Sequence, residues 1–391
     1  MGMPQRTVTS FIGTFLKPEM WHVYNQVTGL RRFRSVVLTR EHQNMDLFPF
    51  EDVHPVRRFR MPLWKRGWLK YVKREPKLVY RGLVPGLIEQ LEELGTDLLH
   101  VYFGHEATRL APLFDHWDRP IVVSFHGADL GVYVRRPNDI EWLPTVFRHA
   151  RLLLVRCEYF VGQLVELGCP PEKIRLNRTH IRLDFFREAR RPMPDDGAWR
   201  LLQACRLLPK KGVLTSIRAF ARFASAFPGA TLTIAGDGPQ LPELEREVAA
   251  LGLGDKVSFP GFLDRDALSA LYQRSHFFLH PSSSGRHNDI EGIPNSLLEA
   301  MATGLVCAST AHAGIPEAMR DGIDGLLVPS EDSDRLAATL IEVARDPARY
   351  RALSAGAAAR IRDEFSYERQ IGALESIYEE ALGSPEVPGQ P

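Results

Sequence analysis

Cysteine is scarce in this sequence, with four among 391 residues. The four stand at positions 157, 169, 205 and 307, with no C-x-x-C pair and no close group of Cys and His. The sequence therefore supports neither a zinc site nor a disulfide framework. Four isolated thiols fit a reducing cytosol.

Long apolar runs are also missing. No stretch approaches the roughly 18 apolar residues that a membrane-spanning helix needs. The N-terminus has no basic segment followed by an apolar one and a cleavage site. We therefore expect a cytoplasmic protein, whose contact with a membrane would be peripheral, on the inner face of the plasma membrane.

No charge of one sign dominates the composition. The chain has 49 Lys and Arg against 48 Asp and Glu, with 44% apolar and 25% charged residues. These values are typical of a soluble globular protein and exclude a disordered or collagen-like chain. At about 150 residues per domain, the length favours two domains, each large enough to bury its own core.

The charge is distributed unequally along the chain. Residues 1–195 carry 30 basic and 22 acidic side chains, a net charge of +8, whereas the rest carry 19 and 26, a net charge of −7. The sign changes near residues 192–197, whose two prolines, two aspartates and glycine are typical of a linker. The predicted parts are an N-terminal domain (residues 1–195), a C-terminal domain (residues 196–365), a final helix (residues 366–382) and a frayed Gly- and Pro-rich tail (residues 383–391).

Short apolar runs alternate with amphipathic stretches along the whole chain. This alternation is typical of strand–helix units around parallel sheets and predicts an α/β protein rather than a sandwich or a helical bundle. The predicted strands cover residues 35–38, 98–103, 121–125, 152–155, 200–204, 230–235, 257–260, 277–279, 306–309 and 325–328. The main predicted helices cover residues 84–94, 213–227, 242–251, 266–273, 296–303 and 332–345.

The clearest functional signal is the stretch HPSSSGRHNDIEGIPNSLLEAMATG, residues 280–304. A strand leads into a polar loop, and the loop leads into a helix predicted to begin near Asn295. Because the first turn of a helix presents unpaired N–H groups and a partial positive charge, it can cradle an anion such as a diphosphate. Gly292 lets the backbone approach a ligand closely, and Pro294 has no N–H to lose there. The predicted cradle consists of Gly292, Ile293, Pro294 and Asn295.

Two carboxylates flank this cradle, Glu291 before the helix and Glu299 one turn into it. Both would repel a diphosphate unless they accept hydrogen bonds from neutral hydroxyls, which sugars and ribose provide. The alternative is that Glu291 is a solvated loop carboxylate and Glu299 an exposed helix residue, as most glutamates are.

The pattern E-G-x-P-x-x-x-x-E-A-x-A-x-G resembles the E-x7-E signature of the retaining glycosyltransferases of family 4. The segments CRLLPKKGV, AGDGPQLPELE and VSFPGFLDRDALSALYQRSHFFLHPS are similar to other segments of this family, in its order, over about residues 198–345. The resemblance implies the GT-B fold, in which two Rossmann-like domains face each other across a cleft and a C-terminal helix crosses back to the N-terminal domain. It also implies a nucleotide diphosphate sugar donor, a hydroxyl acceptor, transfer with retention and no cofactor.

Arg206 and Lys211 follow the first predicted strand of the second domain, where parallel sheets bind ligands at the carboxyl edge. Two cations there can neutralise a diphosphate leaving group, although an isolated basic pair is more often solvated. The resemblance implies that both contact the diphosphate. It further implies that Glu299 holds the nucleotide ribose and that Glu291, with the amides after it, holds the sugar hydroxyls. The same resemblance places Gly236, in AGDGPQLPELE, in the donor site.

In the N-terminal half, VVSFHGADL places His126 after an apolar strand, at another carboxyl edge. A lone histidine is more often structural than catalytic. The segment is similar to the family's strand–His–Gly segment, which implies that His126 faces the transferred sugar and that Asp129 supports it. HVYFGHEA resembles the H-x-H-F-G segment of exopolysaccharide and colanic-acid-type members, with Tyr102 in place of the second histidine. FIGTFLKPEMWHVYNQVTGL is similar to a further segment of that subgroup, which would place Gly13 in a loop near the donor phosphate.

A basic and aromatic stretch spans residues 53–81, and Glu75 is the one acidic residue in it. Its cations are Arg57, Arg58, Arg60, Lys65, Arg66, Lys70, Lys73, Arg74, Lys77 and Arg81, and its aromatic residues include Trp64, Trp68, Tyr71 and Tyr80. This composition suits an anionic membrane surface or a diphospholipid acceptor, but also nucleic acid or a solvated segment. We expect the membrane and no nucleic acid, because the subgroup that the chain resembles often elongates lipid-linked sugars. The expected acceptor is a glycan or a lipid-linked glycan of polysaccharide biosynthesis.

Two D-x-D motifs, at residues 264–266 and 332–334, raise the alternative of a metal-dependent glycosyltransferase of the other major fold. Each motif stands immediately before a predicted helix, where aspartate is a favoured N-cap. We therefore expect both to cap helices, and we expect no metal requirement.

Two other functions stay open as alternatives. A nicotinamide-dependent oxidoreductase would need a G-x-G-x-x-G turn, and GDGP at residues 236–239 lacks the third glycine and has a proline instead. A non-catalytic membrane- or glycan-binding relative would be expected to have lost the site, whereas Arg206, Lys211, Glu291 and Glu299 are all present. The choice between a UDP-linked and a GDP-linked donor is not decided by the sequence.

Overall fold

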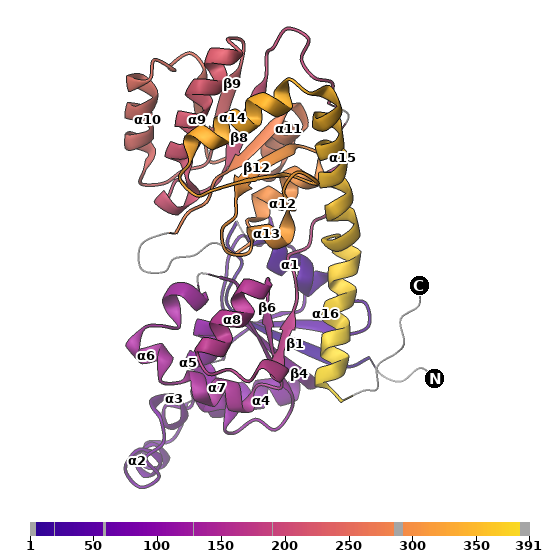
Figure 1. Ribbon diagram of the computed structural model, residues 1–391. Helices are drawn as coiled ribbons and strands as arrows, with labels where there is room; N and C mark the ends of the chain where they lie inside the picture. Colours follow the sequence, from indigo (N-terminus) through magenta and orange to yellow (C-terminus); the bar gives the residue numbers. More distant parts are fainter. Residues whose placement is uncertain are drawn as a thin grey trace. The chain divides into compact units, whose positions relative to one another are not determined.

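The computed structural model describes residues 5–18, 20–57, 60–127, 129–189, 191–284 and 292–383. Within this part of the chain, two compact units each contain one parallel sheet with helices around it (Figure 1). Unit 1 consists of Met1–Arg178 together with Ile371–Pro391, and unit 2 of Thr179–Gln370. The predicted α/β class, with two Rossmann-like domains, is confirmed.

The sheet of unit 1 has, among the described residues, the strand order β3-β2-β1-β4-β5-β6-β7. The chain leaves β1 toward one edge and returns to β4 on the other side of β1, so the order reverses between β1 and β4. The strands are β1 (Thr7–Phe15), β2 (Arg34–His42), β3 (Val53–Pro55), β4 (Thr96–Tyr102), β5 (Ile121–Ser124), β6 (Leu152–Val155) and β7 (Ile174–Leu176). The helices are α1 (Trp21–Thr28), α2 (Leu63–Tyr71), α3 (Lys77–Tyr80), α4 (Leu83–Glu93), α5 (Gly104–Phe114), η1 (Asp129–Tyr133), α6 (Pro137–Ile140), α7 (Leu143–His149), α8 (Glu158–Glu166) and η2 (Pro171–Lys173).

The sheet of unit 2 has the order β10-β9-β8-β11-β12-β13 in the residues described, and its strand order reverses between β8 and β11. Parallel α/β sheets bind ligands at the carboxyl ends of the strands that flank such a reversal. The strands are β8 (Arg200–Ala204), β9 (Thr231–Ala235), β10 (Val257–Gly261), β11 (Phe277–His280), β12 (Val306–Thr310) and β13 (Leu326–Val328). The helices are η3 (Pro209–Lys211), α9 (Val213–Ala226), α10 (Leu241–Ala250), α11 (Arg265–Arg274), α12 (Asn295–Ala302), α13 (Ile315–Ala318), α14 (Ser333–Ala344) and α15 (Pro347–Glu364).

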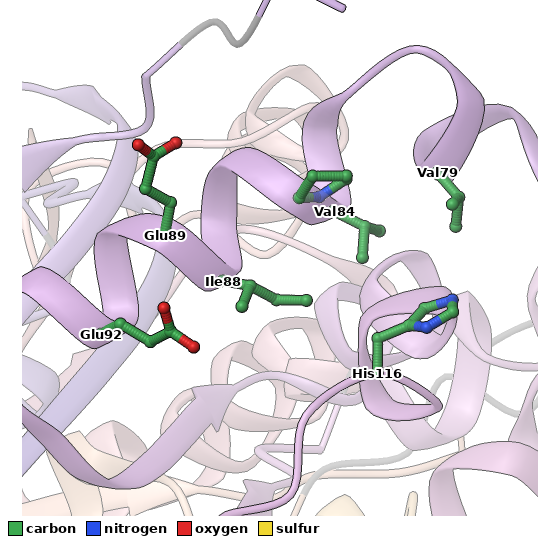
Figure 2. Close-up of a pocket in the computed structure, with 7 residues that line it drawn as sticks. Val79, Val84, Ile88, Glu89, Glu92 and His116 are labelled. Atoms are coloured by element: carbon green, nitrogen blue, oxygen red, sulfur yellow. The ribbon is translucent and has the colours of Figure 1, made fainter. Parts of the chain in front are cut away.

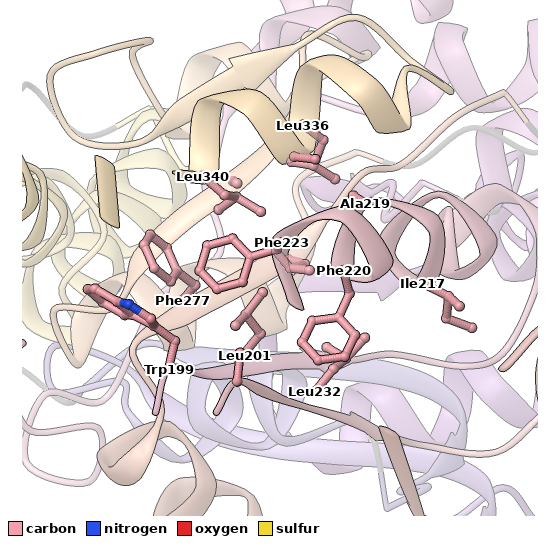
Figure 3. Packing of buried hydrophobic residues seen from close by; sticks show 14 of the residues in the cluster. Trp199, Leu201, Ile217, Ala219, Phe220, Phe223, Leu232, Phe277, Leu336 and Leu340 are labelled. Carbon is pink, nitrogen blue, oxygen red and sulfur yellow. The ribbon is translucent and has the colours of Figure 1, made fainter. Parts of the chain in front are cut away.

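The core of unit 2 fixes this sheet between helices. Figure 3 shows Phe220 and Phe223 of α9 packed over the sheet, with Trp199, Phe277 and Leu336 around them. All five side chains are buried. Because tightly packed interiors hold their backbone in place, the ends of β8 and β11 and the loops that follow them have a rigid base.

Helix α16 (Tyr367–Ala381) begins in unit 2 and, from Ile371 onward, belongs to unit 1. The Oε1 atom of Glu375 accepts hydrogen bonds from the backbone N–H groups of Arg31 (2.6 Å) and Arg32 (2.7 Å). The hydroxyl of Tyr378 lies 2.7 Å from Nδ1 of His100, in β4. The predicted C-terminal helix that returns to the N-terminal domain is therefore confirmed.

The junction between the units lies upstream of the predicted boundary at residues 195 and 196. The backbone N–H of Ala189 donates to the carbonyl of Thr303 (3.1 Å), and the guanidinium of Arg191 donates to the carbonyls of Thr303 and Tyr272. Ala189 and Arg191, which precede the predicted boundary, are therefore already attached to unit 2. That unit begins at Thr179. The predicted tail falls, apart from Gly383, outside the described residues. No helix in the described ranges has the length and apolar character of a membrane span.

Candidate functional site

The loops after β8 and β11 meet at the point where the strand order of unit 2 reverses. Gly212 has a φ of +64°, and a Cβ atom on it would lie 1.8 Å from the carbonyl oxygen of Pro281, so only glycine allows this approach. The backbone N–H of Ser283 donates to the carbonyl of Lys210 (2.9 Å). These contacts hold the segment that carries Lys211 against the loop that leads toward α12.

Gly236 supports the same edge from the next strand. It follows β9 with a φ of +131°, and a Cβ atom there would lie 1.9 Å from the carbonyl oxygen of Cys205. Glycine at position 236 therefore has a role in packing, because it lets the loop after β9 contact the backbone of Cys205, next to Arg206. The predicted contact between Gly236 and a donor stays a prediction.

The two predicted cations differ in exposure. Arg206, two residues after β8, is exposed, whereas Lys211, at the end of η3, is partly buried. The amide of Gln203 donates to the carbonyl of Lys211 (2.8 Å) and fixes the turn. The backbone that carries Lys211 is therefore held beside the ends of β8 and β11, which lowers the conformational entropy lost when an anion binds there.

Helix α12 begins at Asn295, as the sequence predicted. Pro294 is its N-cap with a φ of −65°, Ile293 is buried and Gly292 is partly buried. The first turn directs its N–H groups toward the end of the loop after β11, which is the arrangement of an anion cradle. Glu291, the fourth predicted catalytic residue, lies outside the described residues.

Glu299 is held from a neighbouring helix. The hydroxyl of Tyr272, in α11, donates to its Oε2 atom at 3.0 Å, and the ring of Tyr272 is fully buried. Burial raises the pKa of Glu299, while the hydroxyl of Tyr272 and the charge of Arg265 act in the opposite direction. The alternative that Glu299 is an ordinary exposed carboxylate is wrong, since it is partly buried and oriented by a neighbour.

The sequence analysis missed Tyr272 and Arg265. Arg265 stands in the first D-x-D motif, and its guanidinium lies 3.8 Å from the centroid of the Phe185 ring. Tyr272 lies in a helix whose apolar residues recur at helical spacing, which predicts a buried face. That spacing does not predict which carboxylate accepts a hydrogen bond from the Tyr272 hydroxyl. No signal in the sequence joins either residue to Glu299.

His126, in unit 1, lies just after β5 and is fixed by two neighbours. The guanidinium of Arg156 lies 2.6 Å from its Nδ1 atom, and the hydroxyl of Ser124 lies 2.9 Å from Nε2. Because guanidinium only donates, Nδ1 accepts and the proton is on Nε2. Burial, followed by the charge of Arg156, holds the pKa of His126 well below its usual range, so the ring is neutral. Sequence reasoning found His126 but neither Arg156 nor Ser124.

Asp129 holds the loop of His126, and its predicted role at the transferred sugar stays a prediction. Its carboxylate accepts the backbone N–H groups of His126 (2.8 Å) and Gly104 (2.8 Å) and is buried. Burial raises the pKa of Asp129, and these two backbone donors partly offset that effect.

The predicted position of Gly13 in a loop is wrong. Gly13 lies inside β1, paired with β2 and next to the ion pair of Arg40 and Glu106. A Cβ atom on Gly13 would lie 2.5 Å from Oε1 of Glu106. The glycine therefore makes room for a partly buried ion pair. The loop position had been implied by the resemblance of the segment FIGTFLKPEMWHVYNQVTGL to the subgroup, not by the residues around Gly13.

Both D-x-D motifs begin helices, as predicted. The carboxylate of Asp264 accepts the backbone N–H of Ala267 (2.8 Å) at the start of α11. The carboxylate of Asp332 accepts the backbone N–H of Arg335 (2.8 Å) at the start of α14. The expected capping roles are confirmed. In the residues described, no three Asp, Glu, His or Cys side chains gather as ligands of a metal ion would.

A pocket of about 410 Å³ lies elsewhere in unit 1 (Figure 2). It is lined by Val79, Val84, Pro85, Ile88, Glu89, Glu92 and His116. None of these is a predicted site residue, and two carboxylates with no lysine or arginine are unsuited to a diphosphate. The pocket is therefore separate from the candidate donor site.

Comparisons with known proteins agree with both units. Residues 21–179 match the family model "Glycosyl transferase 4-like domain", and residues 185–360 match "Glycosyl transferases group 1". The chain is 30% identical over 301 residues to the amylovoran biosynthesis glycosyltransferase AmsK of Erwinia amylovora, an alignment that covers 76% of this chain and 74% of that relative.

A second relative is similar over a shorter stretch. The chain is 34% identical over 228 residues to WcaL of Salmonella typhimurium, described as a colanic acid biosynthesis glycosyltransferase. That alignment covers 58% of this chain and 55% of the relative, so it spans about half of the relative's length.

A solved structure shares the fold over nearly the whole chain. The crystal structure of Anabaena Alr3699/HepE in complex with UDP and glucose matches with a TM-score of 0.75 and 17% identity, over 96% of this chain and 99% of that chain. The match confirms the predicted fold class.

Proposed function

The chain belongs to the group 1 glycosyltransferases with a glycosyl transferase 4-like domain, and on this premise we propose that it moves a sugar from a nucleotide diphosphate sugar to a hydroxyl of a glycan or lipid-linked glycan. The observation that carries the proposal is the edge of unit 2 where the turn of Lys210 and Lys211 contacts the loop after β11, the loop that precedes α12 in the sequence. The roles of AmsK in amylovoran biosynthesis and of WcaL in colanic acid biosynthesis support a role in polysaccharide biosynthesis.

We assign the donor to unit 2. Arg206, Lys211 and the first turn of α12 would bind the diphosphate, since cations and a helix start attract the same anion. Glu299 would accept a hydrogen bond from a ribose hydroxyl, and its bond with Tyr272 holds the carboxylate in one orientation. Gly236 and the amides after Gly292 complete the proposed donor site. The donor is UDP- or GDP-linked.

The proposed reaction retains the anomeric configuration. The acceptor oxygen bonds to the anomeric carbon on the face from which the diphosphate leaves, as the bond from that carbon to the phosphate oxygen breaks. The acceptor proton passes to the departing diphosphate, so no protein base is required. Arg206, Lys211 and the α12 amides would stabilise the charge that develops on the leaving group. His126 would face the sugar as a neutral hydrogen-bonding group, held by Arg156 and Ser124.

No metal is needed in this scheme, because two cations and a helix start supply the positive charge for the leaving group. We therefore expect turnover to be unchanged by EDTA. A loss of turnover in EDTA that magnesium or manganese restores would contradict this part of the proposal.

The proposed donor site is tested by the variants Lys211→Ala and Glu299→Gln. Calorimetric titration with UDP-glucose and GDP-mannose should show binding of at least one donor to the wild type and a loss of at least about tenfold in affinity in each variant, about 1.4 kcal/mol. Lys210→Ala and Glu245→Gln are matched controls, since Lys210 adjoins Lys211 and Glu245 is exposed on α10. Unchanged affinity in both site variants would refute the donor site.

Catalysis is tested separately, as release of the nucleotide in the presence of membrane extract that supplies acceptors. The proposal predicts release by the wild type and by both control variants. Donor binding without release would instead favour the non-catalytic alternative, and binding of NAD in place of nucleotide sugars would favour the oxidoreductase.

A further inference from the structure

Helix α2 (Leu63–Tyr71) is a surface element of unit 1 that contributes nothing to the core. All its residues are described, and none of them is buried. It packs on the short helix α3, and Figure 1 shows it at the far end of unit 1, beyond α3 and away from the sheet. Its sequence is therefore not explained by the folding of unit 1.

One half of α2 is apolar and points to solvent. At about 100° per residue, the exposed large apolar side chains of this segment fall within one arc of about 180°, and the partly buried Leu69 lies outside it. They are exposed by the following fractions: Leu63 80%, Trp64 74%, Trp68 45%, Tyr71 73% and Val72 66%. In a soluble protein such an arc normally faces the core. Here large apolar side chains gather in water, which marks an interaction surface.

The opposite half of α2 and its flanks are cationic. Lys65, Arg66 and Lys70 fall outside the apolar arc at the same helical spacing. From residue 57 to residue 74 the sequence has eight Lys and Arg and no Asp or Glu. The ammonium of Lys73 lies 5.3 Å from the ring centroid of Trp68, so a cation borders the aromatic surface.

We propose that α2 lies in the plane of an anionic lipid bilayer, with Leu63, Trp64, Trp68, Tyr71 and Val72 at the boundary of headgroups and acyl chains. Tryptophan and tyrosine favour this boundary because their rings are apolar and their N–H and O–H groups stay hydrated. An apolar arc beside a cationic one is typical of helices that lie in a membrane surface. The cations of α2 and its flanks then face the anionic headgroups.

The charge pattern distinguishes a bilayer from other occupants of this surface. A second copy of the chain would bring one cationic segment against another, which costs association free energy. Nucleic acid would engage the cations and the aromatic rings, but it offers no apolar medium for Leu63 and Val72. A bilayer with anionic headgroups satisfies both halves of the helix. The inference does not depend on the proposed donor site.

The test is co-sedimentation of the whole chain with vesicles of phosphatidylcholine, with and without phosphatidylglycerol. The wild type should bind the anionic vesicles, and the double variant Trp64→Ser and Trp68→Ser should bind at least about tenfold more weakly, since apolar burial contributes to such binding. Phe262→Ser, at an exposed apolar residue of unit 2, is the matched control and should bind as the wild type does.

A charge variant tests the second half of the argument. Lys65→Gln, Arg66→Gln and Lys70→Gln together should remove the preference for phosphatidylglycerol, while Arg335→Gln, Arg345→Gln and Arg351→Gln, three exposed cations of unit 2, should leave it unchanged. Donor binding by calorimetry should stay at the wild-type level in all these variants, which separates this surface from the donor site.

Three results would overturn the proposal. The first is equal vesicle binding by the wild type and the tryptophan variant. The second is an oligomer of the wild type that the tryptophan variant lacks, which would assign the surface to a second copy. The third is binding to single-stranded nucleic acid in preference to anionic vesicles.

Discussion

Glu299 accepts a hydrogen bond from the hydroxyl of Tyr272, which helps to orient its carboxylate. Tyr272→Phe removes that hydroxyl and keeps the buried ring, so the fold should be retained with a loss of about 1 kcal/mol. The hydrogen bond lowers the pKa of Glu299 against the effect of burial, so its loss should raise that pKa further. An ionised Glu299 accepts a hydrogen bond from a ribose hydroxyl more strongly than the neutral acid does. We therefore expect weaker donor binding in Tyr272→Phe, with the acid limb of its pH profile moved to higher pH.

Calorimetric titration of Tyr272→Phe with UDP-glucose and GDP-mannose, repeated over a range of pH, checks this prediction. Tyr350→Phe is the control, because Tyr350 is buried in the same unit and its hydroxyl donates to the carbonyl of His276 (3.2 Å) instead. Identical pH profiles for Tyr272→Phe and the wild type would show that Glu299 does not bind the donor in its ionised form.

The residues that motifs identify were easier to predict than the residues that hold them. The sequence pointed to Glu299 and His126 through their place after strands or within a signature. It did not point to Tyr272 or Arg156, because a hydrogen bond between side chains far apart in the chain depends on how two elements pack. Sequence spacing specifies neighbours on one element only.

At the scale of elements, a buried carboxylate is one of the groups that attach α16 to unit 1. Glu375 accepts two backbone N–H groups and also the Nε–H of Arg32 (3.1 Å). Glu375→Gln replaces one acceptor oxygen by a donor and removes the charge, so it should lower the free energy of unfolding by about 2–3 kcal/mol. Glu379→Gln is the matched control, since Glu379 also binds Arg32 (2.8 Å) but is more exposed, and it should cost about 0–1 kcal/mol.

Urea unfolding of the two variants measures the difference. Similar losses in Glu375→Gln and Glu379→Gln would mean that the buried carboxylate does not anchor α16.

Strand β1 shows why part of the fold escaped prediction. It is a central strand of unit 1 with nearly every residue buried, yet its sequence TVTSFIGTF mixes Thr and Ser with apolar residues. Central parallel strands usually have continuous apolar runs, and such runs predicted β5, β6 and β11. One polar side chain of β1 has a buried partner: the hydroxyls of Thr9 and Thr96 lie 2.7 Å apart.

At the scale of the whole molecule, the division of the chain follows hydrogen bonds rather than composition. The Pro- and Asp-rich stretch near residue 195 is a plausible linker by sequence, but the chain has already joined unit 2 before it, through bonds such as that from Ala189 to Thr303. Length and composition identified two domains, because each domain needs its own core, and the family resemblance implied the returning helix. Composition could not identify where contacts change from one unit to the other.

The free energy of unfolding should decrease in acid because of His100, which lies in β4 and is buried beside Tyr378 of α16. Burial lowers the pKa of His100 to about 3, whereas the unfolded chain takes up a proton near pH 6.5. Between these values the unfolded state binds one more proton, so stability decreases as the pH falls, by about 1.4 kcal/mol per pH unit. His100→Phe should be less stable near neutral pH but should lose this part of the pH dependence.

Urea unfolding near neutral pH and about two pH units lower provides the comparison. Tyr378→Phe removes the same hydrogen bond and retains the imidazole, so it should be destabilised and keep the pH dependence of the wild type. Equal pH dependence in His100→Phe and Tyr378→Phe would contradict the assignment to His100.

The most direct measurement is a crystal structure of the whole chain with UDP-glucose or GDP-mannose, whichever binds in solution. We predict the diphosphate in contact with Arg206, Lys211 and the amides at the start of α12, and a ribose hydroxyl in hydrogen bond with Glu299. A nucleotide bound away from this edge of unit 2, or a bound nucleotide whose ribose does not reach Glu299, would contradict the account.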